Sequence, residues 1–389
     1  MSVKPLQPEL NRRRKEHLYR SRRVSEGPQG PELKMDGHPL LSFCSNDYLG
    51  LANHPDVVAA MQRGTEIYGV GSGSAHLVNG HSQAHHALEE ELAAFTGRPR
   101  ALLFSTGYMA NQGVIAALAG RNDTLYQDRL NHASLIDGGL LSRARMKRFA
   151  HGDTAALQAQ MASQERGEAL VAVDGVFSMD GDLAPLRSLA ALCRGRGAWL
   201  LVDDAHGLGV LGSEGRGSTD HFGLGLDDVP ILMGALGKAF GTFGAFVAGS
   251  DELIETLIQQ ARSYIFTTAL PPAVAEAARA SLRLVRSEEW RREHLRELVK
   301  KFRSGAEQLG LSLMLSETPI QPIVAGSSVQ ALSWSRTLEA QGILVSAIRP
   351  PTVPEGGARL RVTLSANHSF QHLDRLLTAL EQLKIQEVP

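Results

Sequence analysis

Three side chains suited to cofactor chemistry follow two short apolar runs. Asp203 and His206 come directly after the run Trp199–Val202. Lys238 follows the run Ile231–Met233, in a stretch rich in glycine and alanine. Short apolar runs bounded by glycine predict buried strands of a parallel sheet. Ligands bind at the carboxyl ends of such strands, so we expect the three side chains to share one site.

These residue types fit the chemistry of pyridoxal phosphate. A lysine among small residues is suited to partial burial, which lowers an ammonium pKa and frees the amine to form a Schiff base. Asp203 would keep a heteroaromatic nitrogen protonated, and His206 could bond a neighbouring oxygen. Any one of them is more often a helix cap or a solvated side chain. The three residues together, with the glycines around them, favour a site for pyridoxal phosphate, which acts as an electron sink.

A second stretch predicts a place for a phosphate group. The run Ala101–Phe104 predicts a strand, followed by Gly107, Tyr108 and a helix beginning near Asn111. The amides and positive dipole end of a helix N-terminus attract an anion there. We therefore assign the cofactor phosphate to Gly107 and Tyr108, although this spacing also fits an ordinary strand-to-helix turn.

Length and composition exclude several classes of protein. A chain of 389 residues with 43% hydrophobic content predicts two globular domains. A net charge of −1 offers no electrostatic basis for binding nucleic acid or an anionic membrane. The two cysteines, Cys44 and Cys193, are too few for a disulfide framework and are expected to be small buried side chains. With neither a signal peptide nor an 18-residue apolar run, the chain is predicted to be soluble and cytoplasmic.

The elements that must position these residues suggest an α/β fold. We expect a helix and irregular arm over residues 1–45, a large domain with a mostly parallel sheet over 46–285, and a small α/β domain over 286–389. Phe243–Ala248 should be an antiparallel or edge strand, and Arg283–Gln308 a long linking helix.

Three histidines at the start of one helix raise the question of a metal site. Gln83–Phe95 is amphipathic, and its glutamates at 89, 90 and 91 are expected to face water. His81, His85 and His86 stand at its start. We find no carboxylate or thiol spacing that supports a metal site and predict solvated histidines, with no metal.

The quoted motifs resemble those of a known family. Val202–Gly207 and Gly237–Gly241 are similar to the cofactor motifs of the α-oxoamine synthases, fold-type I pyridoxal-phosphate enzymes that condense an amino acid with an acyl thioester. The resemblance extends from Ser45–Gly50 to Arg359–Arg361. It implies a large domain with a mostly parallel sheet, a smaller C-terminal α/β domain and a homodimer with the site at the interface.

The resemblance also implies roles for individual residues. His132 would lie over the cofactor ring and steer the substrate carboxylate, Ser178 would bond near the cofactor oxygen, and Thr268 would reach the phosphate of the neighbouring subunit. The positions expected to contact substrate are Arg20, Asn46, His132, Thr352 and Arg361. Arg361 is the candidate bidentate clamp for a carboxylate, against the alternative of a surface ion pair.

Within the family, Ala347–Pro354 is similar to the branch that condenses L-alanine with pimeloyl-CoA or a pimeloyl carrier protein in biotin synthesis. Two alternatives stay open, a sister synthase using glycine and a short acyl-CoA, and a non-catalytic pyridoxal-phosphate-binding regulator. The chain departs from the family at Ala235, where threonine or serine is common, and at Ser74–His76 in its glycine-rich loop. Thr242 or a water could replace the missing hydroxyl at Ala235.

Overall fold

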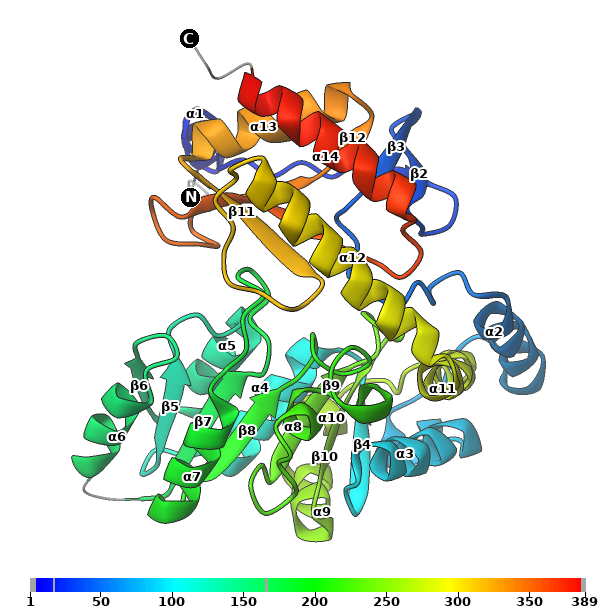
Figure 1. Cartoon of the computed structure of the whole chain (residues 1–389). Coiled ribbons are helices and arrows are strands. Elements are labelled where there is room, and N and C mark those ends of the chain that lie inside the picture. Colours follow the sequence, from blue (N-terminus) through cyan, green and yellow to red (C-terminus); the bar gives the residue numbers. More distant parts are fainter. Residues whose placement is uncertain (1–4, 17, 165–166, 386–389) are drawn as a thin grey trace. The chain divides into compact units, whose positions relative to one another are not determined.

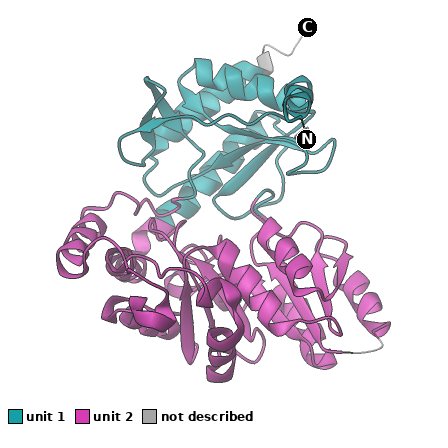
Figure 2. Cartoon of the chain, turned by 180° about the vertical axis from the view of Figure 1, so that it is seen from behind, with its two compact units in different colours: residues 1–46, 179–181, 293–389 teal, residues 47–178, 182–292 magenta. Residues whose placement is uncertain are grey.

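The computed structural model describes residues 5–16, 18–164 and 167–385. It has two compact units, shown in different colours in Figure 2. Unit 1 comprises residues 1–46, 179–181 and 293–389, and unit 2 comprises residues 47–178 and 182–292. The predicted arm over 1–45 lies partly outside the described residues, at 1–4 and 17. The domain boundaries predicted at 45 and 285 stay predictions.

Within the described part of the chain, unit 2 is built on a seven-stranded sheet (Figure 1). In sheet order its strands are β4 (Arg100–Phe104), β10 (Ala245–Gly249), β9 (Ile231–Ala235), β8 (Trp199–Asp203), β7 (Ala169–Asp174), β5 (Thr124–Asp128) and β6 (Arg145–Phe149). β10 is antiparallel to both neighbours, and all other pairs are parallel. The mostly parallel sheet is confirmed, and the strand predicted over Phe243–Ala248 is antiparallel and internal.

Helices cover both faces of this sheet because the strand side chains alternate between two apolar clusters. Along β8, Leu201 packs into one cluster, whereas Leu200 and Val202 pack into the other. The first cluster includes residues of α4 (Gly107–Leu118), α5 (Ala133–Ser142), α9 (Asp251–Gln260) and α10 (Arg262–Ile265). The second includes residues of α6 (Thr154–Ala162) and α7 (Leu186–Arg196). Each fully buried leucine stabilises this arrangement by roughly 1.5–3 kcal/mol.

Unit 2 contains further helices, namely α2 (Pro55–Tyr68), the π-helix η1 (His76–Gly80), α3 (Gln83–Thr96), the 3-10 helix η2 (Ser213–Gly215), α8 (Ser218–His221) and α11 (Pro272–Ser287).

The surroundings of α3 differ in part from those predicted for its histidines and glutamates. The predicted amphipathic helix is α3, ended by Gly97 in the left-handed conformation. Two expectations were wrong, because His85 is fully buried and the Glu89 side chain is only 13% exposed. The Leu103 amide donates a hydrogen bond to Glu89, which draws that carboxyl group inward.

Unit 1 contains two small sheets and the helices beside them. Its elements are α1 (Gln7–Lys15), β1 (Ser25–Glu26), β2 (Glu32–Met35), β3 (His38–Ser42), β11 (Ile320–Gly326), α13 (Ser328–Ala340), β12 (Ile343–Leu344), β13 (Ser346–Ile348), β14 (Ala358–Thr363) and α14 (Phe370–Ile385). Within the described residues one sheet has the order β1-β2-β3-β12 and the other the order β11-β14-β13. The C-terminal α/β character expected from the sequence is therefore present.

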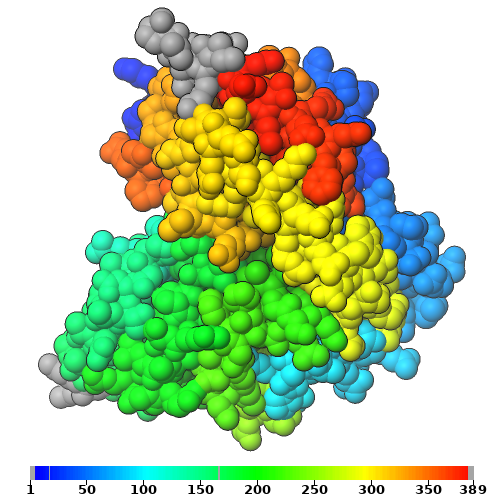
Figure 3. Space-filling model, viewed as in Figure 1, coloured from blue at the N-terminus to red at the C-terminus, as the bar shows by residue number. Residues whose placement is uncertain are grey.

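The predicted linking helix over Arg283–Gln308 is two helices. α11 ends at Ser287, and α12 (Glu289–Gln308) begins after Glu288, whose φ of −105° and ψ of 65° are not helical. The side chains of α12 form part of the surface in Figure 3, in yellow.

Among the described helices, none combines the length and apolar character needed to cross a membrane.

A histidine ties the end of β5 to the loop after β7. His151 contacts Asp128 through Nδ1 at 3.0 Å and Asp182 through Nε2 at 2.8 Å. Hydrogen bonds to Asp128 and then to Asp182 raise the pKa of His151 to about 10, because both carboxylates favour the charged imidazolium. The pair of contacts therefore joins two segments of unit 2 through a cation.

This clamp predicts a pH-dependent loss of stability. The pKa of His151 in the folded protein lies above its ordinary value of 6.5. The contribution of His151 to the free energy of unfolding is therefore fully present below about pH 6.5 and is lost as the pH rises towards 10. Urea unfolding of the wild type and His151→Gln should give a difference in unfolding free energy that narrows across this range. A difference that stays constant with pH would contradict the clamp.

Candidate functional site

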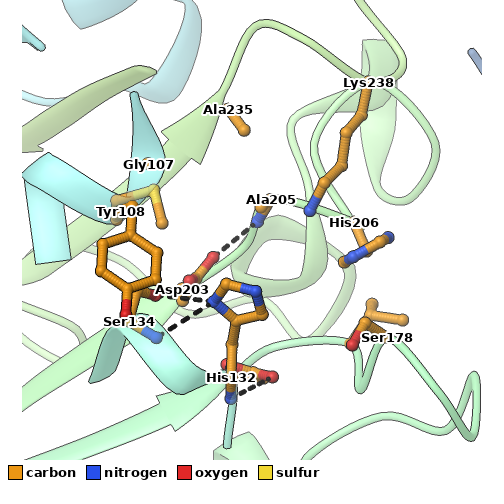
Figure 4. A pocket seen from close by; sticks show the side chains of 13 residues that line it. Gly107, Tyr108, His132, Ser134, Ser178, Asp203, Ala205, His206, Ala235 and Lys238 are labelled. Carbon is orange, nitrogen blue, oxygen red and sulfur yellow. Dashed lines mark hydrogen bonds between the residues drawn. The ribbon is translucent and has the colours of Figure 1, made fainter. Parts of the chain in front are cut away.

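The carboxyl ends of β7, β8 and β9 meet at a cavity of about 190 Å³ in unit 2 (Figure 4). The parallel register places Asp174 beside Asp203, and Asp203 beside Met233. Eight residues predicted to bind cofactor line it: Gly107, Tyr108, His132, Ser178, Asp203, His206, Ala235 and Lys238. The sequence analysis did not single out the remaining lining residues, Ser134, Asp174, Val176, Ala205 and Met233.

Asp203 is a buried carboxylate held by two N–H donors. The residue is 6% exposed, and its Oδ2 accepts a hydrogen bond of 2.7 Å from Nδ2 of Asn111. The Ala205 amide donates to Oδ1 at 3.1 Å. Asn111, fully buried on α4, also donates to Ser134. A negative charge at the end of β8 is thereby oriented towards the cavity.

His132 is fixed just before α5. Its amide donates to Asp174, while the hydroxyl of Ser134 lies 2.7 Å from its Nδ1 and the Ser134 amide also bonds Nδ1. Burial is the main cause that lowers the pKa of His132, so its ring is neutral at pH 7. Because Nδ1 accepts the Ser134 amide proton, the ring proton lies on Nε2. The imidazole can therefore cover a flat ligand with a defined donor.

Asp174 lies deeper than Asp203. It is 3% exposed, and burial, followed by the charge of Asp203, raises its pKa well above the ordinary value. Two adjacent buried carboxyl groups resist simultaneous ionisation. Asp174 thus serves the site through the bond that it accepts from the His132 amide.

Lys238 enters the cavity from the turn after β9. Figure 4 shows its amine pointing towards Ala205 and Asp203, and the residue is half-buried. His206 lies nearby, with its Nδ1 2.7 Å from the hydroxyl of Tyr48. The next residue must be glycine, because a Cβ at Gly207 would clash with Asp204 Oδ1. The sharp turn after β8 thereby delivers both Asp203 and His206 to one edge.

The anion cradle is predicted at the start of α4. The helix begins at Gly107, not near Asn111 as expected, and Thr106 caps it by accepting a hydrogen bond from the Met109 amide. The amides of Gly107 and Tyr108 have no partner within the helix. The Tyr108 hydroxyl donates to Asp137, which holds the aromatic ring at the rim.

Ala235 lines this cavity without offering a hydroxyl group. Thr242, considered as its replacement, donates its hydroxyl to the Leu236 carbonyl at 3.0 Å and is not a lining residue. Of the two compensations considered from the sequence, the one through Thr242 is therefore not realised.

The predicted substrate residues other than His132 lie in unit 1. Arg361 is 7% exposed, and its two terminal nitrogens donate to Asn46 Oδ1 at 3.3 and 3.2 Å. The alternative of a surface position for Arg361 is thus wrong. Arg20 and Thr352 are exposed, and the Thr352 amide bonds the Arg349 carbonyl.

Sequence reasoning missed three residues that position the site. Asn111 holds Asp203, Ser134 holds His132, and Tyr48 holds His206. Tyr48 lies within Ser45–Gly50, and Asn111 lies near the predicted helix start, but all three are polar residues in a turn or helix start and carry no distinguishing pattern. Their partners are distant in sequence except for Ser134, two residues from His132.

These residues fit pyridoxal phosphate. The amine of Lys238 suits its aldehyde, the buried carboxylate of Asp203 suits its ring nitrogen, and the amides of Gly107 and Tyr108 suit its phosphate. The donor set comes entirely from unit 2.

Comparisons with known proteins identify the family of this chain. Residues 38–380 match the family described as aminotransferase class I and II. The 8-amino-7-oxononanoate synthase of Nitrosococcus oceani is 64% identical over 375 residues, which are 96% of this chain and 100% of that protein. The enzyme of the same name from Methylococcus capsulatus is 64% identical over 369 residues, or 95% of each chain.

Solved structures show the same fold. A variant of serine palmitoyltransferase from S. paucimobilis with a bound pyridoxal-phosphate–myriocin aldimine has a TM-score of 0.93 and 30% identity, covering 98% of this chain and 97% of that one. The 8-amino-7-oxononanoate synthase of Francisella tularensis has a TM-score of 0.79 and 32% identity, covering 90% and 99%. The chain therefore belongs to the aminotransferase class I and II family, as a fold-type I pyridoxal-phosphate enzyme of the 8-amino-7-oxononanoate synthase group.

Proposed function

We propose that this enzyme condenses L-alanine with a pimeloyl thioester, with loss of carbon dioxide, to make 8-amino-7-oxononanoate for biotin synthesis. The observation that carries the proposal is the cavity where Lys238, Asp203, His132 and His206 converge. The high identity to synthases of this name, over nearly their whole length, supports the choice of reaction. Overall, a bond forms between the alanine Cα and the acyl carbon, the thiol leaves, and the carboxylate departs as carbon dioxide.

Lys238 is the base in this proposal. When bound, pyridoxal phosphate supplies an electron sink for the charge that develops at the alanine Cα. Lys238 Nζ points into the cavity and can take the Cα proton and later return one to the same carbon. Asp203 keeps a proton on the ring nitrogen, because Asn111 and the Ala205 amide hold its carboxylate in place.

Unit 1 supplies the residues that we assign to substrate. The guanidinium of Arg361 can clamp the alanine carboxylate through two parallel hydrogen bonds, with Asn46 fixing its plane. On the family resemblance, Thr352 is assigned to the acyl chain that the thioester carries, and Arg20 to a contact with substrate. Whether coenzyme A or a carrier protein delivers that chain is an outcome of the assay below.

We also propose a homodimer in which Thr268 serves the partner's site. Thr268 is exposed and does not line the cavity of its own chain. A backbone bridge joins it to Ala75, beside the glycine-rich loop that the resemblance places near the site. An exposed hydroxyl held by such a bridge is suited to reach a neighbouring phosphate.

The reaction is tested by product analysis. We expect purified protein loaded with pyridoxal phosphate to release carbon dioxide from L-alanine, with pimeloyl-CoA and pimeloyl carrier protein supplied in separate reactions. Lys238→Ala should abolish turnover, and Lys300→Ala, at an exposed position on α12, should leave it unchanged. Turnover of glycine but not alanine would favour a sister synthase, and cofactor binding without turnover would favour a regulator.

Asn111 is predicted to hold the cofactor through Asp203. A hydrogen bond to a charged group contributes about 1.5–3 kcal/mol, so Asn111→Ala should weaken pyridoxal-phosphate binding about tenfold or more. The dissociation constant can be measured by the visible absorption of the bound cofactor. Asn122→Ala, at an exposed position before β5, is the control. Equal affinity in both variants would rule out this positioning role.

A hydroxyl restored at position 235 should tighten cofactor retention. Ala235→Thr adds a donor where the family commonly has one, and about 1.5 kcal/mol would slow cofactor release roughly tenfold. Ala235→Val has a similar shape without the hydroxyl and should not slow release. We would abandon the idea if both variants release the cofactor at the wild-type rate.

A further inference from the structure

A group of histidines lies outside the cofactor site. A second cavity in unit 2 has a volume of about 300 Å³. It is lined by His76 of η1, by His81 between η1 and α3, and by His86 and Glu89 of α3. The nearby His85 does not contribute free nitrogens. Its Nδ1 accepts a hydrogen bond from the Ser82 amide, and its Nε2 bonds the Leu270 carbonyl.

His76 fixes the orientation of His81. The His76 ring stacks on Tyr264, with centroids 5.0 Å apart and planes 13° apart, and it is 8% exposed. Its Nδ1 lies 3.0 Å from Nδ1 of His81, so these two atoms share one proton. With that proton on His81 Nδ1, the lone pair of His81 Nε2 faces the cavity.

One carboxylate oxygen of Glu89 lies near His81 Nε2, and the other is hydrogen-bonded elsewhere. One oxygen, Oε1, accepts a hydrogen bond of 2.9 Å from the Leu103 amide. The other, Oε2, lies 3.9 Å from His81 Nε2, too far for a hydrogen bond. A cation lying between Glu89 Oε2 and His81 Nε2 would have both atoms as ligands.

We propose that His81, His86 and Glu89 form a binding site for a zinc ion. One ligand atom from each lies within 4.8 Å of the others. Zinc at 2.0–2.2 Å from nitrogen and oxygen ligands needs them roughly 3.3 Å apart, so the set must contract slightly. His86 is 66% exposed on the first turns of α3 and can move inward. His76 is the outer partner that fixes the ring of His81, as outer hydrogen bonds commonly do in zinc sites.

Zinc binding by the pyridoxal-phosphate-loaded protein tests this site. Competition with a chromophoric chelator should show one tight equivalent of Zn²⁺ in the wild type. Glu89→Gln keeps an acceptor for the Leu103 amide but removes the charge, and should weaken binding about tenfold or more, as should His81→Gln. His76→Phe preserves stacking on Tyr264 and should also weaken binding, by about tenfold.

His221→Asn, at an exposed histidine elsewhere in unit 2, is the matched control and should bind like the wild type. Circular dichroism of each variant shows whether it is folded. The proposal is overturned if the folded wild type binds no tight zinc equivalent. It is equally overturned if folded Glu89→Gln and His81→Gln bind zinc as tightly as the control.

Discussion

The parallel register of β7, β8 and β9 is the constraint on which the cofactor site depends. It sets Asp174 beside Asp203 and ends three strands at one edge. Because side chains alternate along a strand, a slip of one residue would turn Asp203 away from the cavity. Leu200 and Leu201 oppose that slip, since each is fully buried against a different helical layer. The apolar core thereby determines where the chemistry lies.

Electrostatics then limits what this edge can hold. Two buried carboxyl groups at neighbouring strand ends cannot both carry charge at low cost, and the pKa of Asp174 is raised accordingly. Two N–H donors hold the charge of Asp203, whereas Asp174 accepts the amide of His132. The two neighbouring carboxyl groups therefore differ in their surroundings, and Asp174 fixes the backbone at His132.

Much of this arrangement follows from sequence, because it depends on local patterns. Apolar runs and glycines predicted the strands, the edge and the convergence of Asp203, His206 and Lys238; the fold, the cofactor and the family are confirmed. The site roles stay predictions. The errors arose where a distant partner decides burial: helical periodicity placed Glu89 in water, but the amide of Leu103 in β4 draws it inward. Asn111 was overlooked for the same reason.

The fold alone does not select the substrate. A serine palmitoyltransferase shares it with a TM-score of 0.93 at 30% identity, so different acyl acceptors are compatible with one scaffold. Every residue assigned to the cofactor ring and phosphate within one chain belongs to unit 2, whereas Asn46 and Arg361 belong to unit 1. The proposed substrate contacts Asn46 and Arg361 can therefore be substituted separately from Asp203 and Lys238. Variants of these unit 1 residues are accordingly the first place to test selectivity for the amino acid.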